Sequence, residues 1–135
     1  MLIKEASEVI LPKSVLKITT WNVASLAARW NDNFQAYVKT SNPDILCVQE
    51  TKFSDKTSLG NYRIPGYEAY FFNSAARKGY SGTAVYTKFK PLSVKPSFSN
   101  DEGRCITVEF KNFYLINTYC VNAGEGLKTL DKKME

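Results

Sequence analysis

The sequence predicts an α/β fold, and the prediction depends on two strand-like runs with a helix-like stretch between them. Residues 15–23 are rich in β-branched side chains, and residues 44–48, Asp-Ile-Leu-Cys-Val, are almost entirely apolar. Between the two runs, Leu26, Trp30, Phe34 and Val38 recur every fourth residue, which is typical of one face of a helix. A strand, a helix and a second strand in this order predict parallel pairing with a right-handed crossover.

The second of these strands should be buried on both faces and should end at a functional group. A short apolar run without alternation is typical of a strand in a sheet that is covered on both sides. It is followed by Gln49, Glu50, Thr51 and Lys52. Ligands of open α/β sheets bind at the carboxyl ends of strands, so Glu50 is a candidate metal ligand or base. A solvated glutamate just past a strand is the alternative interpretation.

The rest of the chain predicts mostly antiparallel strands and then the beginning of a helix. We expect strands at residues 67–73, 82–87, 105–110 and 113–120, a polar loop at 51–66, and a helix from 127. Because only one face of such a sheet has a helix to cover it, the other face should expose apolar side chains unless something else packs there. The candidates for this face are Leu16, Ile18, Val85, Ile106, Val108 and Leu115.

Length, charge and composition restrict the function classes. The 135 residues suit one domain, and the net charge of +5 suits a polyanionic partner without proving one. There is no histidine, which excludes Ser-His and Cys-His nucleophilic triads and His-based zinc sites. The sequence shows neither a signal peptide nor an apolar run long enough for a membrane span. Cys47, Cys105 and Cys120 lie in apolar runs, and we expect them to be buried free thiols.

Five short blocks occur in a fixed order along the chain. They are Trp21-Asn22-Val23, residues 43–52 (Pro-Asp-Ile-Leu-Cys-Val-Gln-Glu-Thr-Lys), Gly79-Tyr80-Ser81-Gly82, Glu102-Gly103-Arg104 and Tyr119-Cys-Val-Asn122-Ala-Gly124. Together they resemble the exonuclease III type of apurinic/apyrimidinic (AP) endonucleases, within the endonuclease/exonuclease/phosphatase superfamily. The resemblance runs from about Leu16 to Leu130, which is nearly the whole chain.

This resemblance implies a fold and an activity. The fold would be the N-terminal half of a four-layer α/β/β/α sandwich of the DNase I-like kind, with residues 1–14 as a leader and 15–135 as the truncated half domain. The activity would be that of a Mg²⁺-dependent DNA repair nuclease, which hydrolyses the phosphodiester 5′ to an abasic site. Mn²⁺ as an alternative metal and an additional 3′–5′ exonuclease activity are both left open.

The resemblance also implies roles for single residues. Glu50 would ligate the metal, Asn22 would orient the attacking water or a phosphate oxygen, and Tyr119 and Asn122 would hydrogen-bond the scissile phosphate. Each has a plainer alternative, since Asn22 could simply satisfy backbone groups at a strand end and Tyr119 could be a core aromatic residue.

Three further positions would face DNA, and the resemblance implies where the protein acts. Tyr80 and Arg104 match DNA-contacting positions, and Lys52, two residues after Glu50, would lie near it and position a neighbouring carboxylate. The implied partners are DNA containing abasic sites and a complementary C-terminal half, with no membrane partner. We expect an intracellular protein, in the nucleus of a eukaryote and otherwise in the cytoplasm.

The chain departs from the AP endonuclease pattern in three ways. Ala24 stands where that family usually has Asp or Asn, and Glu125 stands where it often has Arg. The later Asp-x-Asn and Ser-Asp-His groups of the family are absent, so we expect the isolated chain to be inactive. Two alternatives stay open: another phosphodiesterase or phosphatase of the superfamily, and a non-catalytic DNA-binding or assembly module derived from it.

Overall fold

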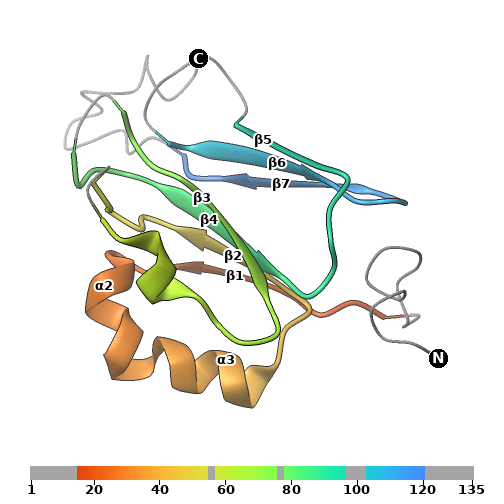
Figure 1. Ribbon diagram of the computed structural model, residues 1–135, viewed down its shortest axis with the longest axis horizontal. Coiled ribbons are helices and arrows are strands. Elements are labelled where there is room, and N and C mark those ends of the chain that lie inside the picture. Colours follow the sequence, from red (N-terminus) through yellow and green to blue (C-terminus); the bar gives the residue numbers. More distant parts are fainter. Residues whose placement is uncertain (1–14, 55–56, 76–77, 97–102, 121–135) are drawn as a thin grey trace.

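Two β-sheets lie face to face, and a helical segment covers the outer face of the larger sheet (Figure 1). The computed structural model describes residues 15–54, 57–75, 78–96 and 103–120. The larger sheet has the strand order β1-β2-β4-β3, and the smaller has the order β5-β6-β7. The strands are β1 (Ile18–Asn22), β2 (Ile45–Gln49), β3 (Glu68–Phe72), β4 (Thr83–Thr87), β5 (Ser93–Pro96), β6 (Cys105–Glu109) and β7 (Tyr114–Thr118).

The predicted strand–helix–strand unit is confirmed. β1 pairs with β2 in parallel, with Asn22 opposite Gln49, and every residue of β2 is buried. β4 pairs antiparallel with both β2 and β3. Because β1 and β2 are parallel neighbours, their carboxyl ends lie at one edge of the sheet.

The helical segment between β1 and β2 is continuous but changes its winding. It consists of α2 (Leu26–Arg29), a π-helical turn (Trp30–Phe34) and α3 (Gln35–Ser41). The hydroxyl of Ser25 caps its start by accepting a hydrogen bond from the Ala28 amide at 3.3 Å. The helix ends at Asn42, whose φ of 51° is left-handed, as is common at helix C-termini.

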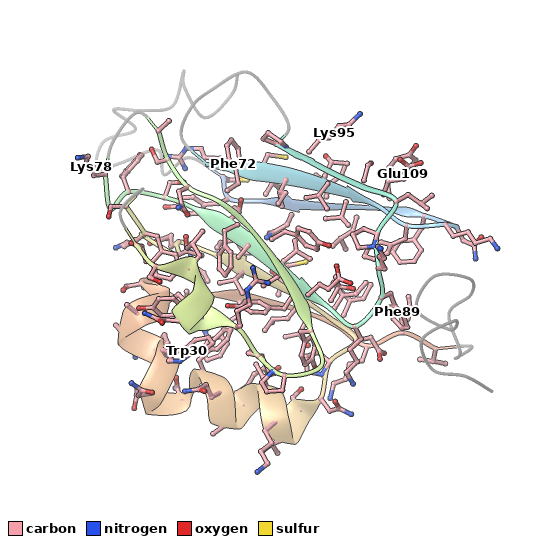
Figure 2. All side chains as sticks on the ribbon, viewed as in Figure 1. Trp30, Phe72, Lys78, Phe89, Lys95 and Glu109 are labelled. Atoms are coloured by element: carbon pink, nitrogen blue, oxygen red, sulfur yellow. The ribbon has the colours of Figure 1, made fainter. Side chains whose placement is uncertain are left out.

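Aromatic rings fill the space between this helical segment and the larger sheet. Phe34, which is fully buried, stacks against Trp21 and Trp30 with ring centroids 5.5 Å and 5.4 Å away. The buried Tyr86 lies against Phe34 at 5.8 Å, and its hydroxyl donates to the Tyr62 carbonyl at 2.6 Å. We call this the helix-side cluster. Figure 2 shows Trp30 between the helical segment and the strands.

The prediction that the other face of the sheet is uncovered is wrong, because β5, β6 and β7 form a second sheet that packs on it. Of the six residues named for that face, Val85, Ile106 and Val108 are buried, Leu16 and Leu115 are half-buried, and only Ile18 is exposed. The buried residues between the two sheets are Ile45, Cys47, Val85, Phe89, Ile106, Val108 and Phe110, here called the sheet-side cluster.

The second sheet forms because alternate residues of β6 and β7 supply an apolar inner face that matches the uncovered one. The sequence gives no sign of β5, whose residues Ser93–Pro96 are short, partly polar and end in proline. A proline is tolerated there because β5 is an edge strand.

The three cysteines do not share one environment. All are free, and Cys47 and Cys105 are buried as predicted. Burial raises the pKa of the Cys47 thiol to about 11. Cys120 is exposed, contrary to the prediction, because β7 ends at Thr118 and no longer covers it.

Some predicted features lie outside the described residues. These are the leader at 1–14, Asn122, Glu125 and the start of a helix from 127. Within the part of the chain that the structure describes, no helix is long and apolar enough to cross a membrane.

Candidate active site

The candidate active site lies where the parallel strands β1 and β2 end. Asn22 is the last residue of β1, and Glu50 directly follows β2. The Asn22 amide donates from Nδ2 to Glu50 Oε2 at 2.7 Å, and its Oδ1 accepts from the Ala24 backbone amide at 3.1 Å. The second bond fixes which end of the Asn22 amide faces the carboxylate. The predicted adjacency of Asn22 and Glu50 is therefore confirmed.

The backbone around Glu50 is held on both sides in an uncommon conformation. Glu50 and Lys52 both have left-handed φ values, 58° and 57°, which non-glycine residues adopt only when the surroundings impose them. The Glu50 carbonyl accepts from the Ser25 amide at 2.8 Å, and the Lys52 amide donates to the Ser81 carbonyl at 2.8 Å. The loops that follow β1 and precede β4 thus hold the turn that carries Glu50.

Glycine is required at Gly82, which precedes β4 and packs against this turn. Its φ is +95°, and a Cβ at this position would lie 2.1 Å from Thr51 Oγ1. The Thr51 amide donates to the Gly82 carbonyl at 3.2 Å. The close approach is therefore part of how the Glu50 turn is held.

Tyr119 is the contribution of the second sheet to the site. It lies just past β7, close enough to Glu50 for its phenol and the carboxylate to shift each other's pKa. The Lys52 ammonium lies 3.7 Å from Glu50 Oε1. The Glu50 carboxylate is therefore hydrogen-bonded by the Asn22 amide and has a phenol and a cation nearby.

These contacts set the protonation states of the site. Burial by itself would raise the pKa of Glu50, but the hydrogen bonds from Asn22 and Tyr119 and the charge of Lys52 outweigh it, so the pKa is lowered. Burial and the hydrogen bond to Glu50 raise the pKa of Tyr119. At neutral pH the site therefore combines an ionised carboxylate with a protonated phenol.

Arg104 is enclosed between two tyrosine rings. Its side chain is 4% exposed, and its guanidinium carbon lies 5.2 Å from the centroid of Tyr80 and 4.8 Å from that of Tyr119. Its Nη2 donates to the Tyr80 hydroxyl at 2.5 Å, and its carbonyl accepts from the Tyr119 amide at 2.7 Å. Arg104 thus links the Gly79–Gly82 loop to Tyr119.

The structure therefore brings together six of the seven site residues predicted from the sequence. Asn22 and Lys52 contact the Glu50 carboxylate, Tyr119 lies near it, and Arg104 joins Tyr80 to Tyr119. The seventh, Asn122, lies outside the described residues.

Two buried amides beneath the site were not identified as functional from the sequence. Gln49 and Asn117 hydrogen-bond each other at 2.8 Å across the two sheets. The signal that could have found Asn117 is a lone amide within the run Tyr-Leu-Ile-Asn-Thr, at an inward-facing position of an alternating strand.

The site offers a partial ligand set for a hard divalent cation. The Glu50 carboxylate supplies oxygen ligands of the kind that Mg²⁺ prefers, whereas the Asn22 side-chain oxygen accepts from the Ala24 amide and its Nδ2 faces Glu50. Over residues 15–54, 57–75, 78–96 and 103–120, no group of three or more His, Cys, Asp or Glu side chains converges. The donor chemistry fits Mg²⁺, with one carboxylate contributed by the described residues.

Comparison with known proteins gives consistent matches. A profile of the Endonuclease/Exonuclease/phosphatase family matches residues 19–123. The chain is 41% identical over 125 residues to a DNA-(apurinic or apyrimidinic site) endonuclease of Dictyostelium discoideum, covering 89% of this chain and 34% of that protein. It is 38% identical over 125 residues to an exodeoxyribonuclease of Bacillus subtilis (strain 168), covering 89% of this chain and 48% of that protein.

Among solved structures, the crystal structure of an AP endonuclease from Leishmania major matches with a TM-score of 0.77 at 27% identity. The match covers 89% of this chain and 44% of that one. The chain thus spans about half or less of the length of the proteins that it matches. The resemblance inferred from the five sequence blocks and the DNase I-like α/β architecture are both confirmed.

Proposed function

Because the chain belongs to the endonuclease/exonuclease/phosphatase family, we propose that it is one part of a Mg²⁺-dependent DNA repair nuclease that hydrolyses the phosphodiester 5′ to an abasic site. The family members that it matches are hydrolases of the nuclease type, and the family depends on divalent metal ions. The observation that carries the proposal is the convergence of Asn22, Glu50 and Tyr119 at one rim, from two sheets.

In this proposal each residue has a chemical task that its surroundings support. Glu50, kept ionised by its donors, would hold the metal, and Asn22 fixes the orientation of that carboxylate. Bound Mg²⁺ would supply Lewis-acid polarisation of a phosphoryl oxygen. Tyr119, kept protonated by its raised pKa, is a hydrogen-bond donor for negative charge on a phosphate. Asn122 would add a second donor.

The DNA-facing residues would act in two ways. Lys52 is exposed beside the carboxylate and would attract the phosphate backbone. Tyr80 is half-buried and would offer a ring edge and hydroxyl to DNA. Arg104, enclosed between the rings of Tyr80 and Tyr119, would support DNA binding by holding those rings in place.

A complementary C-terminal half would complete the site. The matched proteins are about twice as long or longer, and the described residues provide a single carboxylate at the rim. β1 and β7 each lie at an edge of their sheet, with Ile18 48% exposed on β1 and Ile116 61% exposed on β7. Further strands could pair with these edges and cover both side chains, bringing additional metal ligands to the rim.

The test is incision of a duplex that contains one abasic-site analogue, with Mg²⁺ and with a chelator. The chain alone should give no detectable incision, because Mg²⁺ keeps its waters unless several carboxylates and phosphates converge on it. Mixed with or fused to the C-terminal half of a relative, it should incise 5′ to the analogue, and Glu50→Gln should lower the rate by orders of magnitude.

Two results would contradict the proposal. Robust, chelator-sensitive and Glu50-dependent incision by the purified chain would show that its site is complete. A reconstituted protein that binds the duplex but never cleaves it would favour a non-catalytic module, an alternative to which Ala24 points because it removes an oxygen ligand usual in the AP endonucleases.

A further inference from the structure

A pair of buried amides joins the two sheets directly beneath the candidate active site. Gln49, the last residue of β2, is 9% exposed, and Asn117 on β7 is 3% exposed. Gln49 Nε2 donates to Asn117 Oδ1 at 2.8 Å. Asn117 lies opposite Ile106, a member of the apolar sheet-side cluster.

The amide of Asn117 is satisfied by both neighbouring strands of the larger sheet. Its Nδ2 donates to the Ala84 carbonyl at 2.8 Å and to the Val48 carbonyl at 3.1 Å. Val48 and Ala84 face each other across the β2–β4 ladder. Gln49 Nε2 also donates to Thr20 Oγ1 at 2.8 Å, which extends the network to β1. Asn117 is thus tied directly to β2 and β4, and through Gln49 to β1.

Such a network fixes the register between the sheets in a way that apolar contacts do not. Hydrophobic burial has no direction, so aliphatic side chains tolerate small sliding movements of one sheet over the other. Hydrogen bonds weaken steeply when their angles are lost, and a buried amide left without partners destabilises the fold. The Gln49–Asn117 pair therefore supplies a directional constraint on the position of β7 along β2.

This register determines how two groups of the active site meet. Glu50 immediately follows Gln49, and Tyr119 lies two residues beyond Asn117. A shift of β7 along β2 would move the Tyr119 phenol relative to the Glu50 carboxylate, and misplacement by about 1 Å can cost on the order of 10²-fold in rate. We infer that Asn117 is a positioning residue, which together with Gln49 places the Tyr119 phenol beside Glu50.

The meaning of this placement for catalysis rests on the proposed function, but the placement itself can be measured without metal, DNA or turnover. A purely structural role for the amide pair would lower stability and leave the site unchanged in the folded protein. The measurement must therefore separate the geometry of the site from the stability of the fold.

Three variants make this separation. Asn117→Leu replaces the amide by an apolar side chain of similar volume and removes the hydrogen bond between Gln49 and Asn117. Val108→Ala is the matched control, because Val108 is fully buried in the same cluster but lies opposite Leu115. In the double variant Gln49→Met/Asn117→Leu both amides are replaced by apolar groups, which should recover much of the stability lost in the single variant.

The readout is the NMR spectrum of the folded 135-residue chain. The signals of the Tyr119 ring, which lies near Glu50, and of the Asn22 side-chain amide, which hydrogen-bonds Glu50, are assigned with Tyr119→Phe and Asn22→Ser. We expect both signals to shift, and the NOE contacts between them to weaken, in Asn117→Leu and equally in the double variant. Val108→Ala should lose stability with both signals in place.

Unchanged Tyr119 and Asn22 signals in the folded double variant would overturn the inference, whatever its stability. If Asn117→Leu does not fold, the signals of the folded double variant test the positioning role. If neither variant folds, the amide pair is required for folding and the positioning role is overturned. Failure of the proposed function would appear in the incision assay and would leave these spectra as expected, so the two failures are distinguishable.

Discussion

The two faces of the larger sheet are covered by different kinds of side-chain contact. On the helix side, the ring of Phe34 packs 5.5 Å from that of Trp21 and 5.8 Å from that of Tyr86. On the sheet side, apolar residues from both sheets pack together, and the buried amides Gln49 and Asn117 hydrogen-bond each other. The first face gains its stability from large buried rings, while the second contains directional bonds that fix a register.

This difference assigns separate tasks to the two faces. The candidate active site lies at the end of the sheet-side face, where the second sheet delivers Tyr119 to Glu50. Loss of packing on the helix side should therefore reduce stability without moving the site, whereas loss of the amide pair should move it.

Removing the central ring of the helix-side cluster should cause the largest loss of stability. Phe34→Ala deletes a fully buried ring and should lower the free energy of unfolding by about 3–5 kcal/mol. Chemical denaturation measures this loss, and Tyr37→Ala, on an exposed ring of the same helix, should cost clearly less. A shift of the Asn22 side-chain amide signal in folded Phe34→Ala would contradict the separation of the two faces.

A methyl group at Gly82 should strain the turn that carries Glu50. Gly82→Ala combines a φ of +95° with a Cβ only 2.1 Å from Thr51 Oγ1, so we expect a loss of about 1–3 kcal/mol together with a shift of the Glu50 backbone signals. Gly60→Ala is the control, because its Cβ would meet nothing within 4 Å, and it should change stability by no more than about 0.5 kcal/mol. Equal effects of the two substitutions would refute the close-packing argument.

A carboxylate at position 24 should strengthen metal binding with little effect on stability. Ala24 has a left-handed φ of 47°, which Asp and Asn adopt more readily than other non-glycine residues. Ala24→Asp should therefore fold normally and bind Mg²⁺ several-fold more tightly in an NMR titration, while Ala24→Asn should show a smaller gain. Binding no tighter than that of the parent chain would mean that position 24 does not reach the metal.

The smallest expected effect is on the pH dependence of stability. Because the folded-state pKa of Glu50 is lowered, its ionised form stabilises the fold above the unfolded carboxyl pKa of about 4.3, and this contribution disappears as the pH falls through the folded value. Glu50→Gln should thus reduce the acid sensitivity of the unfolding midpoint between neutral and strongly acidic pH. A larger acid sensitivity in Glu50→Gln would mean that the sign of the shift is wrong.

The sequence predicted the parts of this fold that local patterns encode. The uniformly apolar β2 and the fourfold spacing from Leu26 to Val38 required a strand–helix–strand unit, and parallel pairing then placed Asn22 beside Glu50. The second sheet could not be predicted in this way. The alternation of apolar and polar residues in β6 and β7 would be the same if their hairpin extended the larger sheet or packed on its face. Which of the two arrangements forms depends on contacts between residues distant in sequence.

The same limit applies to the site. An arginine that follows glycine in a loop is expected to be exposed. Arg104 is enclosed because its guanidinium stacks between the rings of Tyr80 and Tyr119, a contact that the sequence does not show. Asn117 could not be identified from the sequence, because a single amide in a strand does not show which groups it will bond. Only the fold places it against two carbonyls of the larger sheet and against Gln49, which bonds Thr20.

A divalent metal should bind at the rim formed by Asn22, Glu50 and Tyr119, and paramagnetic Mn²⁺ can locate that site residue by residue. Added to the isotope-labelled chain, Mn²⁺ should first broaden the NMR signals of these three residues, and Glu50→Gln should abolish that broadening. Broadening centred on another carboxylate, such as Glu68 or Glu109, or a pattern unchanged in Glu50→Gln, would contradict the claim.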